Sequence, residues 1–399
     1  MYTGATFGNG HAAAMDKDIL SLEEQIARLQ ALLEASRQVH STIKLDEVLT
    51  QTARILVREL EMNGAAFLAP VTGELMVFYG TLPDPPYADC ARFPLLSKEN
   101  VVMAELVVAT DTPCLSLYEQ DFVEGLVLQA AVALENATFH ERDLEWARVQ
   151  QDLDAARTIQ RSLLPKSMPD IPGYSIAAKT TTCYEVGGDY IDTIQLPDGT
   201  HLMVVADVAG KGLASAIVAT SFRASLRSLV SQPIPLADIV GLVGQQHWEE
   251  GLETRRRYVT AIFMRMHLDQ GIIEVVNAGH NPGALILPDS SIRMIDASGT
   301  PLGMLPGMTY SAETFPFAPG ARILLYTDGL TEVFHGEDEF GSERLTEEFR
   351  GLPFGSAERM LDSLWDTLFT FSVNAHQTDD MTALAVCHLP PSQQETAQT

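Results

Sequence analysis

The stretch VADVAGKGLASA, residues 205–216, is an apolar run that reaches a carboxylate at Asp207, turns through two glycines and continues as the start of a helix. Its Gly-Lys-Gly turn resembles a phosphate-binding loop, but that loop requires the pattern GxxxxGK[ST]. Here Val205 stands in the place of the first glycine, and Gly212 stands where the hydroxyl residue should follow the lysine. We therefore discard a nucleotide cradle and take Asp207 as the candidate functional residue.

Three other carboxylates stand in similar places beside predicted strands. Asp189 follows two glycines in VGGDYID, Asp328 ends the apolar run of LLYTDG, and Asp379 precedes the strand of TDDMTALAV. A carboxylate at the edge of a buried strand is held rigidly and reaches the rim of the core, which suits hard cations such as Mg²⁺ or Mn²⁺. Each one taken singly is more often a turn or strand-boundary residue. Four together favour a shared cation site.

The composition limits the possible partners. The chain has 399 residues, enough for two domains, and carries 26 Lys and Arg against 53 Asp and Glu, a net charge of −27. This charge repels nucleic acids and anionic membranes. No apolar stretch approaches the roughly 18 residues that cross a bilayer, and the N-terminus has no basic segment followed by an apolar one. We expect a soluble, cytoplasmic protein with no nucleic-acid or membrane partner.

The periodicity of the first half predicts helices around a small α/β domain. Residues 1–15 are small and polar and are expected to be disordered, whereas residues 16–36 show 4-3-4 apolar spacing that fits a short coiled coil or an ordinary amphipathic helix equally well. Residues 37–145 alternate a helix, a hairpin turning at Thr72-Gly73, an apolar strand and a long helix. That last helix, 121–164, stops at Pro165 and is longer than one domain, which predicts a connecting helix within a homodimer.

Residues 37–145 also resemble a GAF domain, the small-molecule-sensing module of bacterial signalling proteins. The resemblance rests on the order of the elements and on LQAAVALENATFHERD, which is similar to the closing helix of that family. It implies a sensor domain. The connection TLPDPPYADCARFPLLSKEN is short for a region that encloses a ligand, so ligand binding stays open.

From residue 166 to 389 the chain is rich in β-strands separated by turns, with hairpins outnumbering βαβ crossovers. This pattern predicts mixed or antiparallel sheets with helices outside them, followed by a disordered tail at 390–399. Seven motifs in this region resemble, in this order, the SpoIIE/RsbU-type branch of the metal-dependent PP2C (PPM) serine/threonine phosphatases. They are AARTIQRSLLP, VGGDYID, VADVAGKGLASA, NAGHNPGAL, LLYTDGLTE, FGSERL and TDDMTALAV. The resemblance implies an αββα sandwich with two Mn²⁺ or Mg²⁺ ions at one edge of its sheets.

The resemblance also implies a role for each carboxylate. Asp207 would bridge the two ions, the Val208 carbonyl would be a backbone ligand, and Asp189 would bind one ion while Asp328 and Asp379 hold the other. Because adjacent strand residues point to opposite faces, only one side chain of the Asp379-Asp380 pair can face the site, and the family pattern favours the first. By the same alternation, Asp192 in VGGDYID should face away.

The implied chemistry is hydrolysis of a phosphoserine or phosphothreonine. Two cations supply positive charge in an acidic chain and lower the pKa of water, so that hydroxide can attack phosphorus in line. His280 in NAGHNPG is either a general acid or, as we favour, a residue that orders its loop. Lys211 either contacts phosphate or is a solvated loop lysine, and we favour the second role.

Phosphatases of this branch act in partner switching, so the resemblance implies a phosphorylated STAS-type anti-sigma-factor antagonist as the substrate. A diguanylate cyclase is discarded, because Tyr190-Ile191 replaces the acidic-aromatic pair of GGDEF. A non-catalytic PP2C-like regulator that binds the partner protein is the alternative. Such a protein should lose metal carboxylates, and here all four are present.

Overall fold

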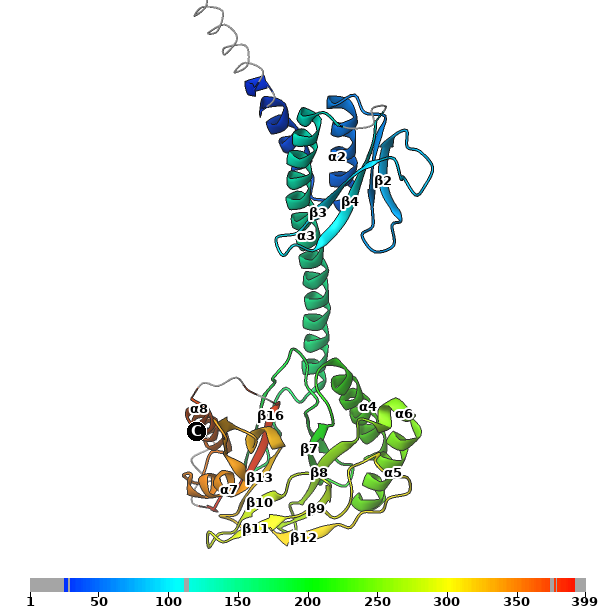
Figure 1. Cartoon of the computed structure of the whole chain (residues 1–399). Helices are drawn as coiled ribbons and strands as arrows, with labels where there is room; N and C mark the ends of the chain where they lie inside the picture. Colours follow the sequence, from blue (N-terminus) through cyan, green and yellow to red (C-terminus); the bar gives the residue numbers. More distant parts are fainter. Residues whose placement is uncertain (1–24, 28, 111–114, 374–376, 378, 392–399) are drawn as a thin grey trace, which may run out of the picture. The chain divides into compact units, whose positions relative to one another are not determined.

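The computed structural model describes residues 25–27, 29–110, 115–373, 377 and 379–391. The expected disordered segment 1–15, residues 392–399 of the expected disordered tail 390–399, and the first part of the predicted coiled coil lie outside these residues. The chain forms two compact units, Met1–Val149 and Gln150–Thr399 (Figure 1).

The first unit contains a four-stranded antiparallel sheet with the order β2-β1-β4-β3. Its strands are β1 (Gly64–Leu68), β2 (Leu75–Gly80), β3 (Ala91–Leu96) and β4 (Val102–Ala109). The β1–β2 hairpin and β4 confirm the prediction. β3 was not predicted, because its sequence ARFPLL contains Pro94, which argues against a strand. An edge strand tolerates that residue, since one side of it needs no ladder hydrogen bond.

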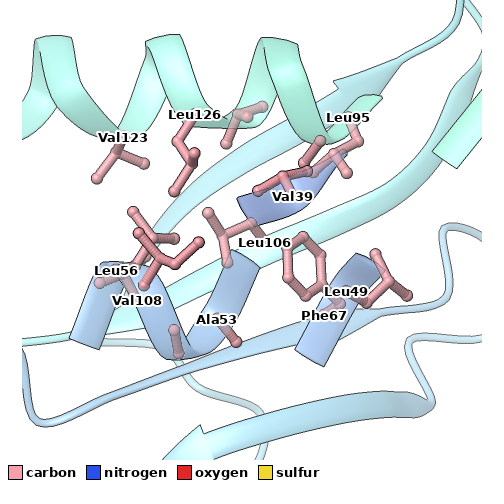
Figure 2. Close-up of a cluster of buried hydrophobic side chains, with 14 of the residues drawn as sticks. Val39, Leu49, Ala53, Leu56, Phe67, Leu95, Leu106, Val108, Val123 and Leu126 are labelled. Atoms are coloured by element: carbon pink, nitrogen blue, oxygen red, sulfur yellow. The ribbon is translucent and has the colours of Figure 1, made fainter. Parts of the chain in front are cut away.

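Helices cover one face of this sheet. Residues 29–39, α2 (Leu45–Glu59) and the first part of α3 (Leu117–Leu163) pack on it, and Figure 2 shows their apolar side chains meeting those of the strands. The opposite face holds Ala66, Leu68 and Val107, which are covered by Tyr87 from the connection between β2 and β3. Tyr87 therefore covers only part of the second face, since Phe78, which pairs with Ala66, stays exposed.

Helix α3 is continuous from Leu117 to Leu163 and begins about one turn before the predicted start. Its buried residues end at Ala137, and beyond this point Phe139, Trp146 and Val149 are exposed. The helix therefore carries an uncovered apolar surface after it leaves the sheet.

Among the described residues, one helix, α3, is long and apolar enough to cross a membrane when only its length and composition are considered. This differs from the expectation that no apolar stretch is long enough to cross a bilayer. Half of the qualifying window is buried inside the protein, and a core helix passes the same test. The finding therefore supports a membrane span only weakly.

The second unit is built on two five-stranded antiparallel sheets. The first sheet has the order β11 (Ile292–Ile295), β10 (Gly283–Ile286), β13 (Arg322–Tyr326), β16 (Met381–His388) and β5 (Tyr174–Thr181). The second has the order β12 (Glu313–Pro316), β9 (Ile272–Ala278), β8 (Val259–His267), β7 (His201–Val208) and β6 (Tyr190–Gln195). The predicted strands are present, whereas the short edge strands β11 and β12 were missed.

Three apolar layers hold this unit together. One lies between the sheets and includes Met203, Ile262 and Leu325. Helices α4 (Leu213–Leu229) and α5 (Leu236–Glu249) pack on the outer face of the second sheet. Helices α7 (Gly341–Gly351) and α8 (Ala357–Ser372) pack on the outer face of the first. The layers form an αββα sandwich. Three smaller elements complete it: α6 (Leu252–Arg255), the 3-10 turn η1 (Asp328–Leu330) and the hairpin of β14 (Phe334–His335) with β15 (Asp338–Glu339).

Candidate metal and phosphate site

Three of the four predicted carboxylates line one cleft of about 240 Å³. Asp207 lies near the end of β7 in the second sheet, Asp328 follows β13 of the first sheet, and Asp379 precedes β16 of the same sheet. The cleft therefore lies where the two sheets meet at one edge of the sandwich. The other lining residues are Ala209, Gly210, Lys211, Tyr258, Thr260, His280 and Asn281.

The fourth carboxylate, Asp189, lies deeper. Its side chain is only 7% exposed and accepts a hydrogen bond from Thr327 Oγ1 at 2.9 Å. The negative charge of Asp207 raises the pKa of Asp189, after the larger effect of burial. A Cβ atom at the preceding residue, Gly188, would lie 3.4 Å from Asp207 Oδ1, so the loop that carries Asp189 packs beside Asp207, although Asp189 does not line the cleft itself.

Burial and mutual repulsion raise the pKa values of this cluster. Burial, followed by the charges of Asp328, Asp379 and Asp380, raises the pKa of Asp207 to about 7. Burial and the charge of Asp379 also raise the pKa of Asp328. A bound divalent cation would remove this repulsion, because it interacts favourably with every carboxylate at once.

The donor set fits Mg²⁺ or Mn²⁺, with water as part of the coordination. In the described part of the chain, no three His, Cys, Asp or Glu side chains are arranged to hold one ion. Mg²⁺ retains several waters and is usually bound through one or two carboxylates, so a full cage of side chains is not required. The backbone also contributes, since a Cβ atom at Gly188 would lie 2.9 Å from the Val208 carbonyl oxygen. Only glycine therefore fits beside that carbonyl, and Val208 itself is buried and is not among the residues that line the cleft.

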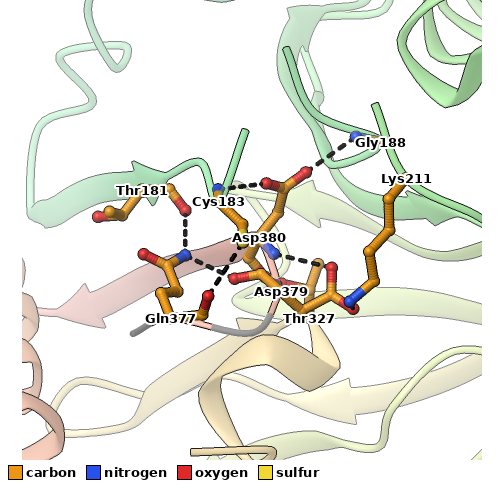
Figure 3. A network of polar contacts seen from close by, with 8 residues as sticks. All are labelled: Thr181, Cys183, Gly188, Lys211, Thr327, Gln377, Asp379 and Asp380. Atoms are coloured by element: carbon orange, nitrogen blue, oxygen red, sulfur yellow. Dashed lines mark hydrogen bonds and ion pairs between the residues drawn. The ribbon is translucent and has the colours of Figure 1, made fainter. Parts of the chain in front are cut away.

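Asp380, the neighbour of Asp379, has a different role. Its carboxylate accepts hydrogen bonds from the backbone N–H groups of Cys183, at 2.7 Å, and Gly188, at 2.9 Å. Figure 3 shows Asp380 directed to this glycine loop and Asp379 directed to Lys211. The two adjacent side chains thus point in different directions. Asp379 faces the cleft, and Asp380 holds the loop that precedes Asp189.

Asp192 does not line the cleft. It is fully buried and forms an ion pair with Arg227 of α4, in which the guanidinium donates to both carboxylate oxygens at 2.7 Å. The Tyr190 hydroxyl also donates to it. Its role is to join β6 to α4.

His280 is buried beside the cleft, and its environment favours a structural role. Nδ1 lies 2.8 Å from Thr260 Oγ1, and the backbone N–H donates to Asn277 Oδ1 at 2.8 Å. Burial lowers the pKa of His280 to about 4. The imidazole is therefore neutral near pH 7 and carries no extra proton to donate.

Sequence reasoning missed several residues that support the site. Thr327 donates to Asp189. Gln377 donates to the Asp379 carbonyl and, at 2.9 Å, to the Thr181 carbonyl (Figure 3). Thr327 directly precedes Asp328, so its position beside a candidate ligand was the available signal. Gln377 has no such signal, because its contacts depend on the folded loop.

Part of the second unit matches a known protein family. Residues 197–389 match the model of the family described as Stage II sporulation protein E (SpoIIE). The IcfG protein of Synechocystis sp. is 26% identical over 266 residues, which cover 59% of this chain and 41% of that protein. Phosphoserine phosphatase RsbP of Bacillus subtilis is 25% identical over 186 residues, 46% of each chain. This chain thus spans less than half the length of these two relatives.

The fold has a counterpart among solved structures. The SiaA-PP2C domain of Pseudomonas aeruginosa superposes with a TM-score of 0.53 at 22% identity, covering 60% of this chain and 97% of that domain. At this identity the likeness concerns the fold, and it agrees with the αββα layers described above. The C-terminal half of the chain therefore has a PP2C-like fold, and residues 197–389 within it match the SpoIIE family model.

Proposed function

We propose that this protein is a metal-dependent serine/threonine phosphatase that hydrolyses a phosphorylated protein. The observation that carries the proposal is the convergence of Asp207, Asp328 and Asp379 on one open cleft, with Asp189 close enough to Asp207 for their charges to interact. PPM-type phosphatases use Mg²⁺ or Mn²⁺. A cluster of partly buried carboxylates that raise one another's pKa values is suited to such cations.

The residues of this chain would divide the work as follows. Asp207, Asp189 and the Val208 carbonyl would hold cations on the side of the second sheet, and Asp328 and Asp379 would hold them on the side of the first. Two bound ions would supply positive charge for the phosphate and lower the pKa of the attacking water. Tyr258 and Asn281 line the same cleft and would contact the substrate. Neutral His280 would keep its loop in place.

The substrate that we propose is a phosphorylated STAS-type anti-sigma-factor antagonist in a bacterial partner-switching pathway. This part rests on the motif resemblance to SpoIIE/RsbU-type phosphatases and on the similarity to phosphoserine phosphatase RsbP. The chain charge of −27 makes a concentrated positive site necessary for binding a phosphoserine dianion. Because we assign the protein to such a pathway, we also propose that it acts in the cytoplasm.

We also propose that the first unit is a GAF-like sensor and that the chain forms a homodimer through its helices. The sheet with helices on one face supports the first idea. The exposed side chains of Phe139, Trp146 and Val149, which follow heptad-like spacing along α3, support the second. A partner helix would bury them.

The test is phosphate release from a phosphoserine peptide and from a phosphorylated STAS protein, with Mn²⁺ or with a chelator. The proposal expects metal-dependent release by the wild type, a near-background rate for Asp207→Asn and a wild-type rate for Asp289→Asn, a fully exposed carboxylate in the β10–β11 turn. Binding of the partner without any phosphate release would instead favour the non-catalytic regulator.

A further inference from the structure

Gln160, on the last turns of α3, binds one residue of the glycine loop through both ends of its side-chain amide. Its Nε2 donates to the Gly187 carbonyl at 2.7 Å, and its Oε1 accepts from the Gly187 N–H at 3.3 Å. A side-chain amide that uses its donor and its acceptor on one backbone residue fixes both the place and the orientation of that residue. Both residues lie within the second unit.

Gly187 is closely confined on its other side. A Cβ atom there would collide with the Asp380 carboxylate, which binds the next backbone N–H, that of Gly188. The loop is thus held between Gln160 on one side and Asp380 on the other.

The position of this loop sets the geometry of the candidate metal site. A Cβ atom at Gly188 would lie 2.9 Å from the Val208 carbonyl oxygen and 3.4 Å from Asp207 Oδ1, so the loop backbone packs directly on two predicted ligands. Asp189, a third, is the next residue along the chain. A shift of Gly187 would therefore move Asp189 relative to Asp207.

The end of α3 is itself fixed to this unit. Arg223 Nε of α4 donates to the Leu163 carbonyl at 2.9 Å, and Leu164 packs against the two apolar layers on either side of the second sheet. The turn that carries Gln160 is therefore fixed to the second unit, and the glycine loop is hydrogen-bonded to this turn.

We propose that Gln160 is a positioning residue for the cation site: it holds the Gly187-Gly188-Asp189 loop against Asp207 and Val208, so that metal affinity depends on how the last turns of α3 are seated. This inference rests on the proposed function, because it assumes that the cleft binds divalent cations. It differs from a purely structural role in one respect. Loss of the contact should weaken cation binding more than it weakens the fold.

The experiment compares three full-length variants with the wild type. Gln160→Leu removes both hydrogen bonds, and Gln160→Asn keeps the amide but is one methylene too short to make them. Gln151→Leu places the same leucine at an exposed position of the same helix, and is the matched control. The dissociation constant for Mn²⁺ is measured by titration calorimetry, and the melting temperature is measured in chelator.

We expect Mn²⁺ to bind about tenfold more weakly to both Gln160 variants, the lower end of the range for residues that orient metal ligands. The melting temperature in chelator should change little, saturating Mn²⁺ should restore most of the turnover, and Gln151→Leu should match the wild type. If Gln160→Leu does not fold, the dissociation constant of Gln160→Asn for Mn²⁺ tests the inference instead.

Unchanged Mn²⁺ affinity in the Gln160 variants, or a loss of turnover that saturating Mn²⁺ does not restore, would overturn the inference while the proposed function stands. A wild-type protein that binds no Mn²⁺ would overturn both.

Discussion

Lys211 Nζ lies 2.8 Å from Asp379 Oδ2, within the cleft that Asp207 and Asp328 also line. The loop lysine therefore has a defined partner. The sequence alone indicated only a phosphate contact or a solvated side chain for it. It places one positive charge among the carboxylates. A cation that binds Asp379 must compete with this ammonium group for the same oxygen atoms.

Replacing Lys211 should consequently strengthen metal binding. Lys211→Gln removes the competing charge, and we expect Mn²⁺ to bind up to about fivefold more tightly, which corresponds to the upper end for a partly exposed ion pair. Titration calorimetry with Mn²⁺ measures the effect. Lys179→Gln is the control, because Lys179 forms an ion pair with Asp362, outside the cleft. Weaker Mn²⁺ binding by Lys211→Gln would show that the ammonium does not compete for Asp379.

The second prediction concerns the bridging position. Asp207→Asn removes one of several repelling charges, so in chelator the variant should melt no lower than the wild type. In the wild type, Mn²⁺ at a hundredfold excess over its dissociation constant should stabilise the fold by about 2.7 kcal/mol. This stabilisation should shrink in the variant, and phosphate release should fall to near background. Differential scanning calorimetry with and without Mn²⁺ checks it, and a wild-type Mn²⁺ shift together with substantial activity would disprove the ligand role.

For Asp192, which lies outside the cleft, we expect a loss of stability without a change in metal binding. Asp192→Ala leaves the Arg227 guanidinium and the Tyr190 hydroxyl without their buried partner, and we expect a loss of about 3 kcal/mol, the lower end for a broken buried ion pair, because Arg227 is partly exposed. Denaturant unfolding in chelator measures this loss. The Mn²⁺-induced stabilisation should remain as in the wild type. A selective loss of Mn²⁺ binding with unchanged stability would place Asp192 in the metal site after all.

The sequence was most informative where one local pattern fixed one local structure. Apolar runs predicted β7, β13 and β16, and a carboxylate at either end of such a run predicted a group at the rim of the core. The short edge strands β3 and β12 were not predicted. They contain Pro94 and Pro316, respectively, and bury few side chains.

The supporting contacts of the site could not be predicted in the same way. Thr327 binds Asp189 across 138 positions of sequence, and Gln160 reaches Gly187 across 27. Such contacts depend on how the sheets and the end of α3 pack, and no periodicity reports them. Gln160 belongs to the motif AARTIQRSLLP that carried the family resemblance, but the motif alone did not tell what its amide binds.

The fourth prediction uses the continuity of α3, which has no break between Leu117 and Leu163. One to three residues inserted near Gln150 turn the following helix by about 100° each, whereas seven residues nearly preserve its phase. If the helix transmits a signal rigidly, phosphatase regulation should vary with the length of the insert and return near seven. Phosphate release by the insertion series measures this. Equal behaviour at every length would exclude a rigid relay.

The last prediction concerns the pH dependence of stability without metal. Burial and neighbouring charges raise the pKa of Asp207 to about 7 in the folded protein, whereas an unfolded aspartate titrates near 3.9. Between these values the folded state retains a proton that the unfolded state has lost, so the protonated carboxyl contributes stability that is complete below about pH 4 and is lost as the pH rises through about 7.

Asparagine does not titrate, so Asp207→Asn should lose less stability than the wild type between these pH values. Melting temperatures of both proteins in chelator at pH 5, 6 and 7 measure the difference, which should grow with pH in favour of the variant. Saturating Mn²⁺ should reverse the order at pH 7, because the charged carboxylate is then the favoured form. Parallel curves for the two proteins in chelator would mean that Asp207 is already ionised at pH 5, and that the carboxylates of the cleft do not repel one another strongly enough to need a cation.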